Sequence, residues 1–249
     1  MNASYLLAEL TWPEVKAYLE QGYLAVLPIG AACKEHGHHL PMNTDFIQAE
    51  WLAQQTSLLC PSLIWPIMSY GFYPKFVEYP GSCSVSEVTF SQSIHDILQS
   101  ILRAGANRIM ILNTGISTIR PLENMLGELN KHKQIILFNV YSGSNFTNAV
   151  NEIEQQAVGG HADEIETSIM LTLAPDKVDM TKAKNFDSEL VAGPLNPNDP
   201  DKPNYSPYGV IGDARLATIE KGEILTKAIL ADLAELIKKI IEDRIHNSR

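Results

Sequence analysis

The sequence predicts an α/β fold with a mostly parallel central sheet, formed by residues 1–249 as a single domain. Short apolar segments alternate with longer ones whose apolar residues recur at helical spacing, which is typical of parallel strands joined by helices. The chain is long enough for one large core, and no shift in composition marks a second domain. Apolar residues make up 45% and charged residues 19%, so an ordinary globular protein is expected.

Four short apolar segments are the expected strands. Each has the length of a strand and is followed by Gly, Pro or polar turn residues. They are residues 23–27, 63–68, 108–112 and 134–140.

The segments between these strands are expected to be helices. Thr11 and Glu14 have the spacing of a capping box around Pro13, so the first helix should run over residues 12–20. Six further helices are expected: one that starts at 44 or 45, one over 89–104, one that starts near 118, one that ends at about 156, one over 163–173 and one over 217–245. Residues 175–208, rich in Pro, Asn and Asp, should form a long ordered surface excursion.

The net charge limits the classes of partner that are expected, and the cysteine content bears on the cellular compartment. The formal net charge is −10, and Lys238-Lys239 is the largest basic cluster, so neither nucleic acid nor an anionic membrane is an expected partner. A small-molecule substrate is expected instead. Cys33, Cys60 and Cys83 have no paired spacing and are read as reduced thiols. Since the first ten residues resemble no signal or spanning segment, a cytoplasmic location is expected.

A dense set of metal-binding side chains follows the first expected strand. Loops at the ends of buried strands are where α/β proteins usually place their chemistry. Three imidazoles and two carboxylates suit an ion such as Zn, Mn or Fe better than Ca or Mg. A lone Asp here would be explained as a helix cap, but this density in a chain with seven His favours a metal site. The residues are Glu35, His36, His38, His39 and Asp45.

Two separated motifs resemble the signatures of the creatininase (creatinine amidohydrolase) family. Residues 27–30 (LPIG), 36–37 (HG), 39–41 (HLP) and 44–45 (TD) resemble the pattern P-x-G-S-x-E-Q-H-G-P-H-L-P-L-x-T-D. Residues 160–168 (GHADEIETS) resemble G-H-A-G-E-x-E-T-S. Weaker similarity extends over nearly the whole chain.

The resemblance implies a three-layer α/β/α sandwich that hydrolyses a carbon–nitrogen bond other than a peptide bond, often in a cyclic amide. It implies one or two divalent ions per protomer, which would activate a water molecule, and a homo-oligomer, commonly a hexamer. The implied site has one proton carrier, His161, outside the coordination shell. Its implied metal ligands are His36, Asp45, Glu164 and, as a fourth, Glu35.

The chain departs from the family pattern in two places, which suggests a divergent branch. Lys34 occupies the Glu column when the match is made without a gap from Asp45. After the third expected strand the family reads N-G-H-G-G-N, whose His is a ligand, whereas residues 113–118 read NTGIST. One ion is therefore expected as readily as two. The residues expected to bind substrate are Asn113, Thr114, Gly115, Ser117, Tyr70 and His39.

Three alternatives to the metal-dependent amidohydrolase remain open. Cys33 would be a nucleophile activated by Lys34 and His36 in a cysteine hydrolase. A scaffold that has lost turnover would keep only a ligand pocket or an assembly role. In the third alternative, the protein would use the metal for isomerase or deformylase-type chemistry on a different substrate.

Overall fold

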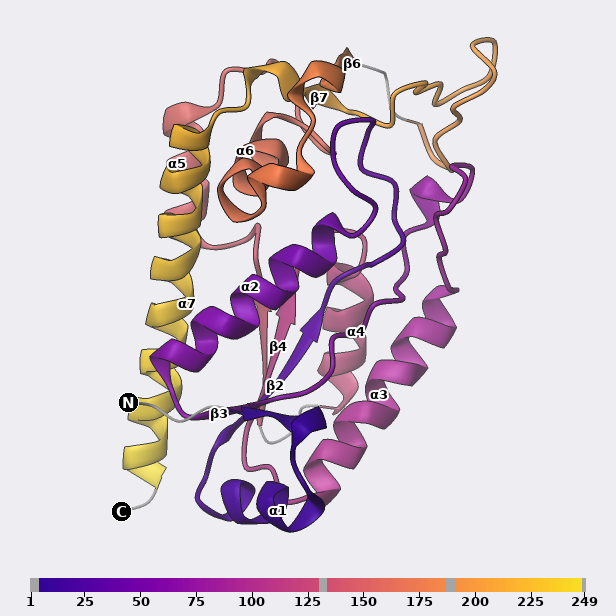
Figure 1. Ribbon diagram of the computed structural model, residues 1–249. Helices are drawn as coiled ribbons and strands as arrows, with labels where there is room; N and C mark the ends of the chain where they lie inside the picture. Colours follow the sequence, from indigo (N-terminus) through magenta and orange to yellow (C-terminus); the bar gives the residue numbers. More distant parts are fainter. Residues whose placement is uncertain (1–4, 130–133, 187–190, 248–249) are drawn as a thin grey trace.

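The computed structural model describes residues 5–129, 134–186 and 191–247, and its centre is a parallel sheet (Figure 1). The sheet has five strands in the order β1-β3-β2-β4-β5, and each neighbouring pair is parallel. Four of the strands correspond to the expected apolar segments, and β1 is an additional two-residue edge strand. The strands are β1 (Tyr5–Leu6), β2 (Leu24–Ile29), β3 (Ser62–Ile64), β4 (Ile109–Asn113) and β5 (Ile135–Asn139).

Helices cover both faces of this sheet (Figure 1). Alternate residues of β2 and β4 enter two separate cores: Val26 and Met110 belong to one, Leu27 and Ile111 to the other. The first core includes α2 (Thr44–Leu59), α5 (Ser144–Ile153), α6 (Glu164–Leu173) and α7 (Ile219–Asn247). The second includes α1 (Trp12–Glu20), α3 (Glu87–Arg103) and α4 (Ile119–Leu129). The expected three-layer α/β/α sandwich is thereby confirmed.

Most element boundaries lie close to the expected ones, and the differences have local causes. Helix α1 has the expected bounds and the expected capping box. Strand β3 stops at Ile64, where Pro66 lacks an N–H for the ladder, although Met68 rejoins β2 in a single bridge. Helix α5 ends at Ile153, because the backbone amides of Gln155 and Gln156 donate to the carboxylate of Glu164 instead of to helix carbonyls.

The carboxyl ends of β2 and β4 position the loops that carry polar residues. Gly30 ends β2 so close to α2 that a Cβ there would lie 2.4 Å from the carbonyl oxygen of Asp45. This close approach places the first turn of α2 directly at the strand end. The expected surface excursion, residues 175–208, lies above this strand end in Figure 1, and its residues 187–190 fall outside the described residues. It includes a short strand β6 (Asn185–Phe186), which pairs with β7 (Gly212–Asp213). Leu195 from this region is fully buried.

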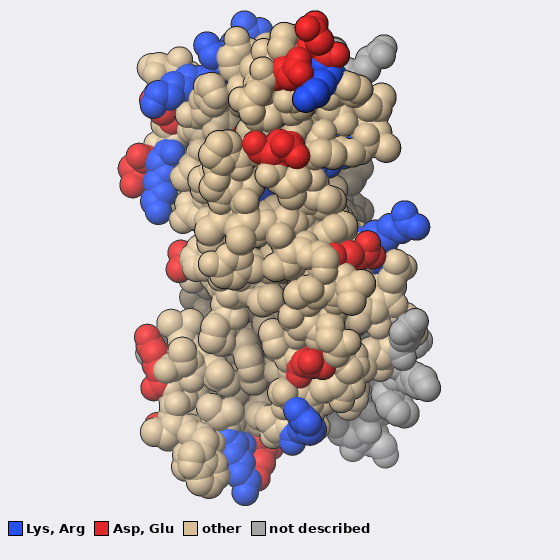
Figure 2. All heavy atoms as spheres, turned by 90° about the vertical axis from the view of Figure 1, so that its right-hand side faces the viewer, with Lys and Arg blue, Asp and Glu red and all other residues tan. Residues whose placement is uncertain are grey.

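The surface shows no strong segregation of charge on the face seen in Figure 2. Acidic and basic side chains occur there in small mixed groups separated by uncharged surface. Among the described residues, none of the helices combines the length and apolar character needed to cross a membrane.

Candidate metal centre

The ring of His36 is fixed through one nitrogen and presents the other to two carboxylates. Its Nδ1 lies 2.8 Å from the carbonyl oxygen of Lys34, which can only accept, so Nδ1 carries a proton. Its Nε2 lies 3.0 Å from Asp45 Oδ1 and 3.6 Å from Glu166 Oε1. In the neutral ring Nε2 and both oxygens are electron-pair donors. Three donors directed at one point repel one another unless a proton or a metal cation lies between them.

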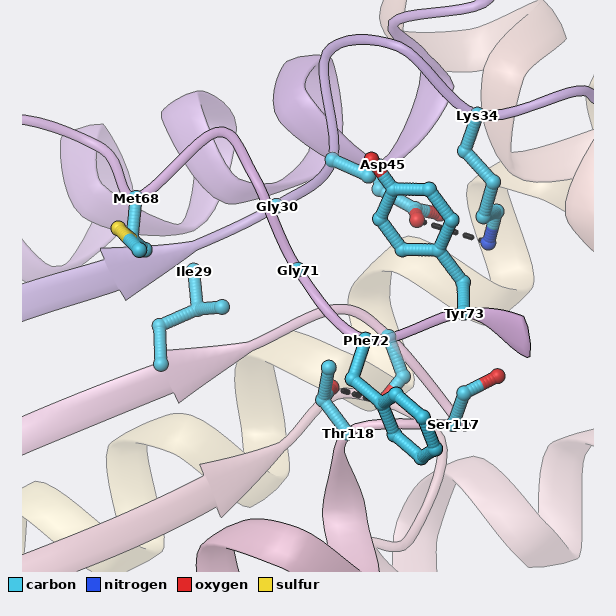
Figure 3. Close-up of a pocket in the computed structure, with 12 residues that line it drawn as sticks. Ile29, Gly30, Lys34, Asp45, Met68, Gly71, Phe72, Tyr73, Ser117 and Thr118 are labelled. Atoms are coloured by element: carbon cyan, nitrogen blue, oxygen red, sulfur yellow. Dashed lines mark hydrogen bonds and ion pairs between the residues drawn. The ribbon is translucent and has the colours of Figure 1, made fainter. Parts of the chain in front are cut away.

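Asp45 forms a second, separate ion pair with Lys34. Asp45 lies in the first turn of α2, and its Oδ2 is 2.8 Å from Lys34 Nζ (Figure 3). Burial alone would raise the pKa of Asp45, but the Lys34 ammonium and the interactions with His36 outweigh it and lower that pKa. Burial would likewise lower the pKa of Lys34, yet Asp45, Glu166 and Glu35 together raise it. Both partners are therefore charged.

His161 reaches the same place from the turn before α6. Its Nε2 lies 2.9 Å from the carbonyl oxygen of Glu35 and 3.1 Å from Glu35 Oε2, so it donates to Glu35. Its Nδ1 is left facing Glu166 Oε2 at 3.7 Å. Burial lowers the pKa of His161, but the hydrogen bond and the charge of Glu35 raise it above its usual value overall.

The three acids at the start of α6 have three different roles. Asp163 caps the helix by accepting from the backbone amides of Ile165 and Glu166. Glu166 faces the histidines, and its Oε2 accepts from the amide of Ala162 at 2.8 Å. Burial would raise the pKa of Glu166, but His36, His161 and Lys34 lower it, so Glu166 is ionised.

Glu164, the acid expected to bind metal, has the third role. Its carboxylate accepts from the backbone amides of Gln155 and Gln156 at 2.9 and 2.8 Å and pairs with Lys221. Residues two apart on a helix point about 200° away from each other, so Glu164 and Glu166 cannot both face the histidines. Glu164, the acid expected as a ligand, is therefore not brought to the histidines, and Glu166 faces them instead. The sequence held one usable signal: only one of these two acids can lie on the inner face.

Glu35 is also not placed as a ligand. Its Oε1 accepts from the backbone N–H of Gly37 and its Oε2 from His161. It packs against Gly209, where a Cβ would lie 1.7 Å from Glu35 Oε1. Glu35 therefore orients His161, as acidic partners commonly orient metal-site histidines, rather than joining the group itself.

The side chains that come together fit a divalent ion. His36, His161 and Glu166 each offer a ligand atom, and these atoms lie within 4.8 Å of one another. Asp45 adds an oxygen beside His36. Mixed imidazole and carboxylate donors are the chemistry of Zn and Mn sites. The second nitrogen of each imidazole is held by Lys34 or Glu35, which fixes the ring orientation as metal sites require.

A pocket of about 580 Å³ opens beside this group, with His161, Glu166 and Lys34 among its lining residues. The remaining wall is largely apolar and includes Phe72, Phe76, Ile116, Phe146 and Ile211. A side chain or ring of moderate size therefore has room next to the Glu166 carboxylate and the Lys34 ammonium.

The residues expected to bind substrate divide into two groups. Thr114 and Ser117 line this pocket, and Gly115 lines the small neighbouring pocket of Figure 3. Asn113, Tyr70 and His39 line neither. The Asn113 amide bonds to Gly115 and Asn139, Tyr70 is 50% exposed, and His39 Nε2 lies 2.8 Å from Thr167 Oγ1.

Cys33, the nucleophile of one alternative, lines neither pocket. Its carbonyl oxygen accepts from the backbone N–H of Cys83. The thiol alternative gains no support from this arrangement.

The fold and the site together define an α/β/α sandwich protein with a histidine–carboxylate centre at the carboxyl ends of its strands. The chain belongs to the creatininase family, whose model, described as creatinine amidohydrolase, matches residues 8–237. It is 25% identical to a creatinine amidohydrolase of Pseudomonas putida, over 96% of this chain and 98% of the relative. It is also 25% identical to a 3-dehydro-scyllo-inosose hydrolase of Thermotoga maritima, over 94% and 82% of the two chains.

Solved structures show the same fold. A crystal structure of creatinine amidohydrolase (creatininase) matches with a TM-score of 0.78 at 24% identity, over 94% of this chain and 96% of that one. A mutant creatininase described as Zn-Zn type matches with the same TM-score, and a further structure is titled Creatininase Mn. That this chain forms a divergent branch stays a prediction.

Proposed function

We propose that this protein is a metal-dependent hydrolase that cleaves the carbon–nitrogen bond of a small amide, with His36, Asp45 and Glu166 as the metal ligands. One observation carries the proposal: His36 Nε2 lies 3.0 and 3.6 Å from oxygens of two buried carboxylates, beside a pocket. Family membership and the hydrolase names of the relatives support it. A divalent ion held there would lower the pKa of its bound water from about 15.7 to about 7 and would polarise the amide carbonyl.

His161 is the proposed proton carrier. It borders the pocket, whereas His36 does not. Glu35 holds its Nε2 and raises its pKa, so the imidazole can take a proton and deliver it to the leaving nitrogen. Glu35 acts through His161 and is a positioning residue.

The pocket supports a substrate with an apolar part. Aromatic and aliphatic side chains form most of its wall, while Lys34 and Ser117 supply polar groups. Small lactams, cyclic ureas and formamides with an apolar substituent fit this description. The cytoplasmic location and the homo-oligomer stay predictions.

Metal analysis followed by a substrate screen tests the proposal. Protein purified without added metal and then loaded with Zn or Mn should hold at least one ion per chain and hydrolyse a member of the amide panel. His161→Gln should keep the ion and lose turnover, whereas His95→Gln, on the exposed side of α3, should keep both. Protein that binds no ion after loading would be a scaffold. Turnover abolished by Cys33→Ala would favour the cysteine hydrolase.

A further inference from the structure

A lysine lies inside the acidic centre and has little contact with solvent. Lys34 is 7% exposed, and its Nζ lies 2.8 Å from Asp45 Oδ2 and 5.3 Å from the ring centre of Phe76. Its backbone amide donates to the carbonyl oxygen of Met42, which anchors the residue in the loop. A buried ammonium of this kind needs a fixed negative partner, and Asp45 provides it (Figure 3).

Asp45 connects this ammonium to the proposed ligand group. Its Oδ1 faces His36 Nε2 at 3.0 Å, and its Oδ2 faces Lys34 Nζ. One oxygen of Asp45 thus faces the proposed metal site at His36, and the other faces the Lys34 ammonium, which already supplies a positive charge.

The charges of the centre balance with a single divalent ion. Asp45, Glu166 and Glu35 are buried carboxylates, and Lys34 is a buried ammonium. With both imidazoles neutral, these four groups leave a charge of minus two, which one divalent ion cancels. A second ion would leave an excess of two positive charges with no counter-charge among these groups, which is costly in a buried site.

The small pocket beside the Lys34–Asp45 pair supplies no further ligands for a second ion. The pocket there has a volume of about 10 Å³, roughly the room for one water. Asp45 is the only carboxylate or imidazole among its lining residues in the described part of the chain. Gly115, on the opposite loop, has no side chain to contribute, and a Cβ there would lie 2.7 Å from Thr118 Oγ1.

We propose that the Lys34 ammonium is a built-in cation that takes the place of a second metal ion, so that each chain binds one divalent ion. The inference rests on the metal site of the proposed function and specifies its stoichiometry.

Titration calorimetry and elemental analysis with Zn and Mn test this inference. Wild-type protein should bind one ion per chain. Lys34→Glu, which exchanges the ammonium for a carboxylate, should bind two. Lys34→Gln should bind its first ion at least about tenfold more tightly, because the repulsion from the ammonium is removed and Asp45 Oδ2 becomes available.

Two variants serve as controls. Lys34→Arg keeps the charge and should keep one ion with the wild-type affinity. Lys221→Gln removes another largely buried lysine paired with an acid, Glu164, but outside the centre, and should leave the stoichiometry unchanged. Thermal melts establish that each variant is folded.

The outcomes separate this inference from the proposed function. Two ions in wild-type protein, one ion in folded Lys34→Glu, or an unchanged or weaker affinity in Lys34→Gln would overturn the inference alone. Absence of any bound ion in wild-type protein would overturn the metal site, and the inference with it.

Discussion

Glu164 and Glu166 lie two residues apart in α6, and their neutralisation should have opposite effects. Glu166→Gln removes a negative charge from the point on which His36 and Asp45 converge. Loss of an outer partner of a metal ligand typically weakens metal binding 10–100-fold, so loss of a proposed ligand should weaken Zn binding by about 100-fold or more. The fold should be little affected, because the Gln side-chain oxygen can still accept from the Ala162 amide.

Glu164→Gln should instead destabilise the fold and leave metal binding unchanged. Its carboxylate is fully buried, accepts two backbone N–H bonds and pairs with Lys221, whose side chain is 13% exposed. Breaking a buried ion pair costs about 3–5 kcal/mol, and the partial exposure of Lys221 favours the lower value, about 3 kcal/mol. For a chain of this size that loss lowers Tm by roughly 6–12 °C.

Calorimetric unfolding and Zn titration of the two variants measure both effects side by side. Glu166→Gln should melt near the wild-type temperature and bind Zn poorly, and Glu164→Gln should do the reverse. If Glu164→Gln loses Zn while Glu166→Gln keeps it, the assignment of Glu166 to the metal centre is refuted.

Three further predictions concern other parts of the chain. Burial lowers the pKa of His39 to about 4 from 6.5, so the unfolded state binds its proton more readily. The resulting contribution to the free energy of unfolding, up to about 3 kcal/mol, is complete above pH 6.5 and is lost as the pH falls toward 4. In urea unfolding, the free energy of unfolding of His39→Gln should therefore change less with pH across this window than that of the wild-type protein. Gly209→Ala, at φ +62° and in contact with Glu35, should lower the free energy of unfolding by about 1–3 kcal/mol. Gly127→Ala, on α4 with no atom near its Cβ position, should raise it by about 0.5–1 kcal/mol. Equal effects of the two variants in denaturant melts would contradict the packing described. Cys33→Ala should retain wild-type turnover of the amide found in the screen, because the thiol lines neither pocket; a loss of more than about tenfold would count against this placement.

The layers of the fold follow from local sequence patterns. The apolar segments of β2 and β4 and the capping box of α1 specify their elements without reference to the rest of the chain. The end of α5 does not, because it depends on the carboxylate of Glu164 binding the backbone of Gln155 and Gln156. Such a contact becomes visible only when two elements are placed side by side.

Part of the site could be predicted from the sequence, because some of its residues are brought together by local structure. His36 and Asp45 lie in one loop and its following helix turn, so their proximity is encoded locally. The choice between Glu164 and Glu166 depends on how α6 is rotated against α2 and α7. The orientation of Glu35 depends on the distant Gly209, whose lack of a side chain leaves room for the carboxylate that bonds to His161.

Anomalous diffraction at the zinc edge from crystals of Zn-loaded protein tests the central account most directly. It should show an anomalous peak about 2.0–2.2 Å from His36 Nε2 and from carboxylate oxygens of Asp45 and Glu166. A fully loaded crystal with no peak at that point, or with Zn bound only elsewhere, would contradict the account.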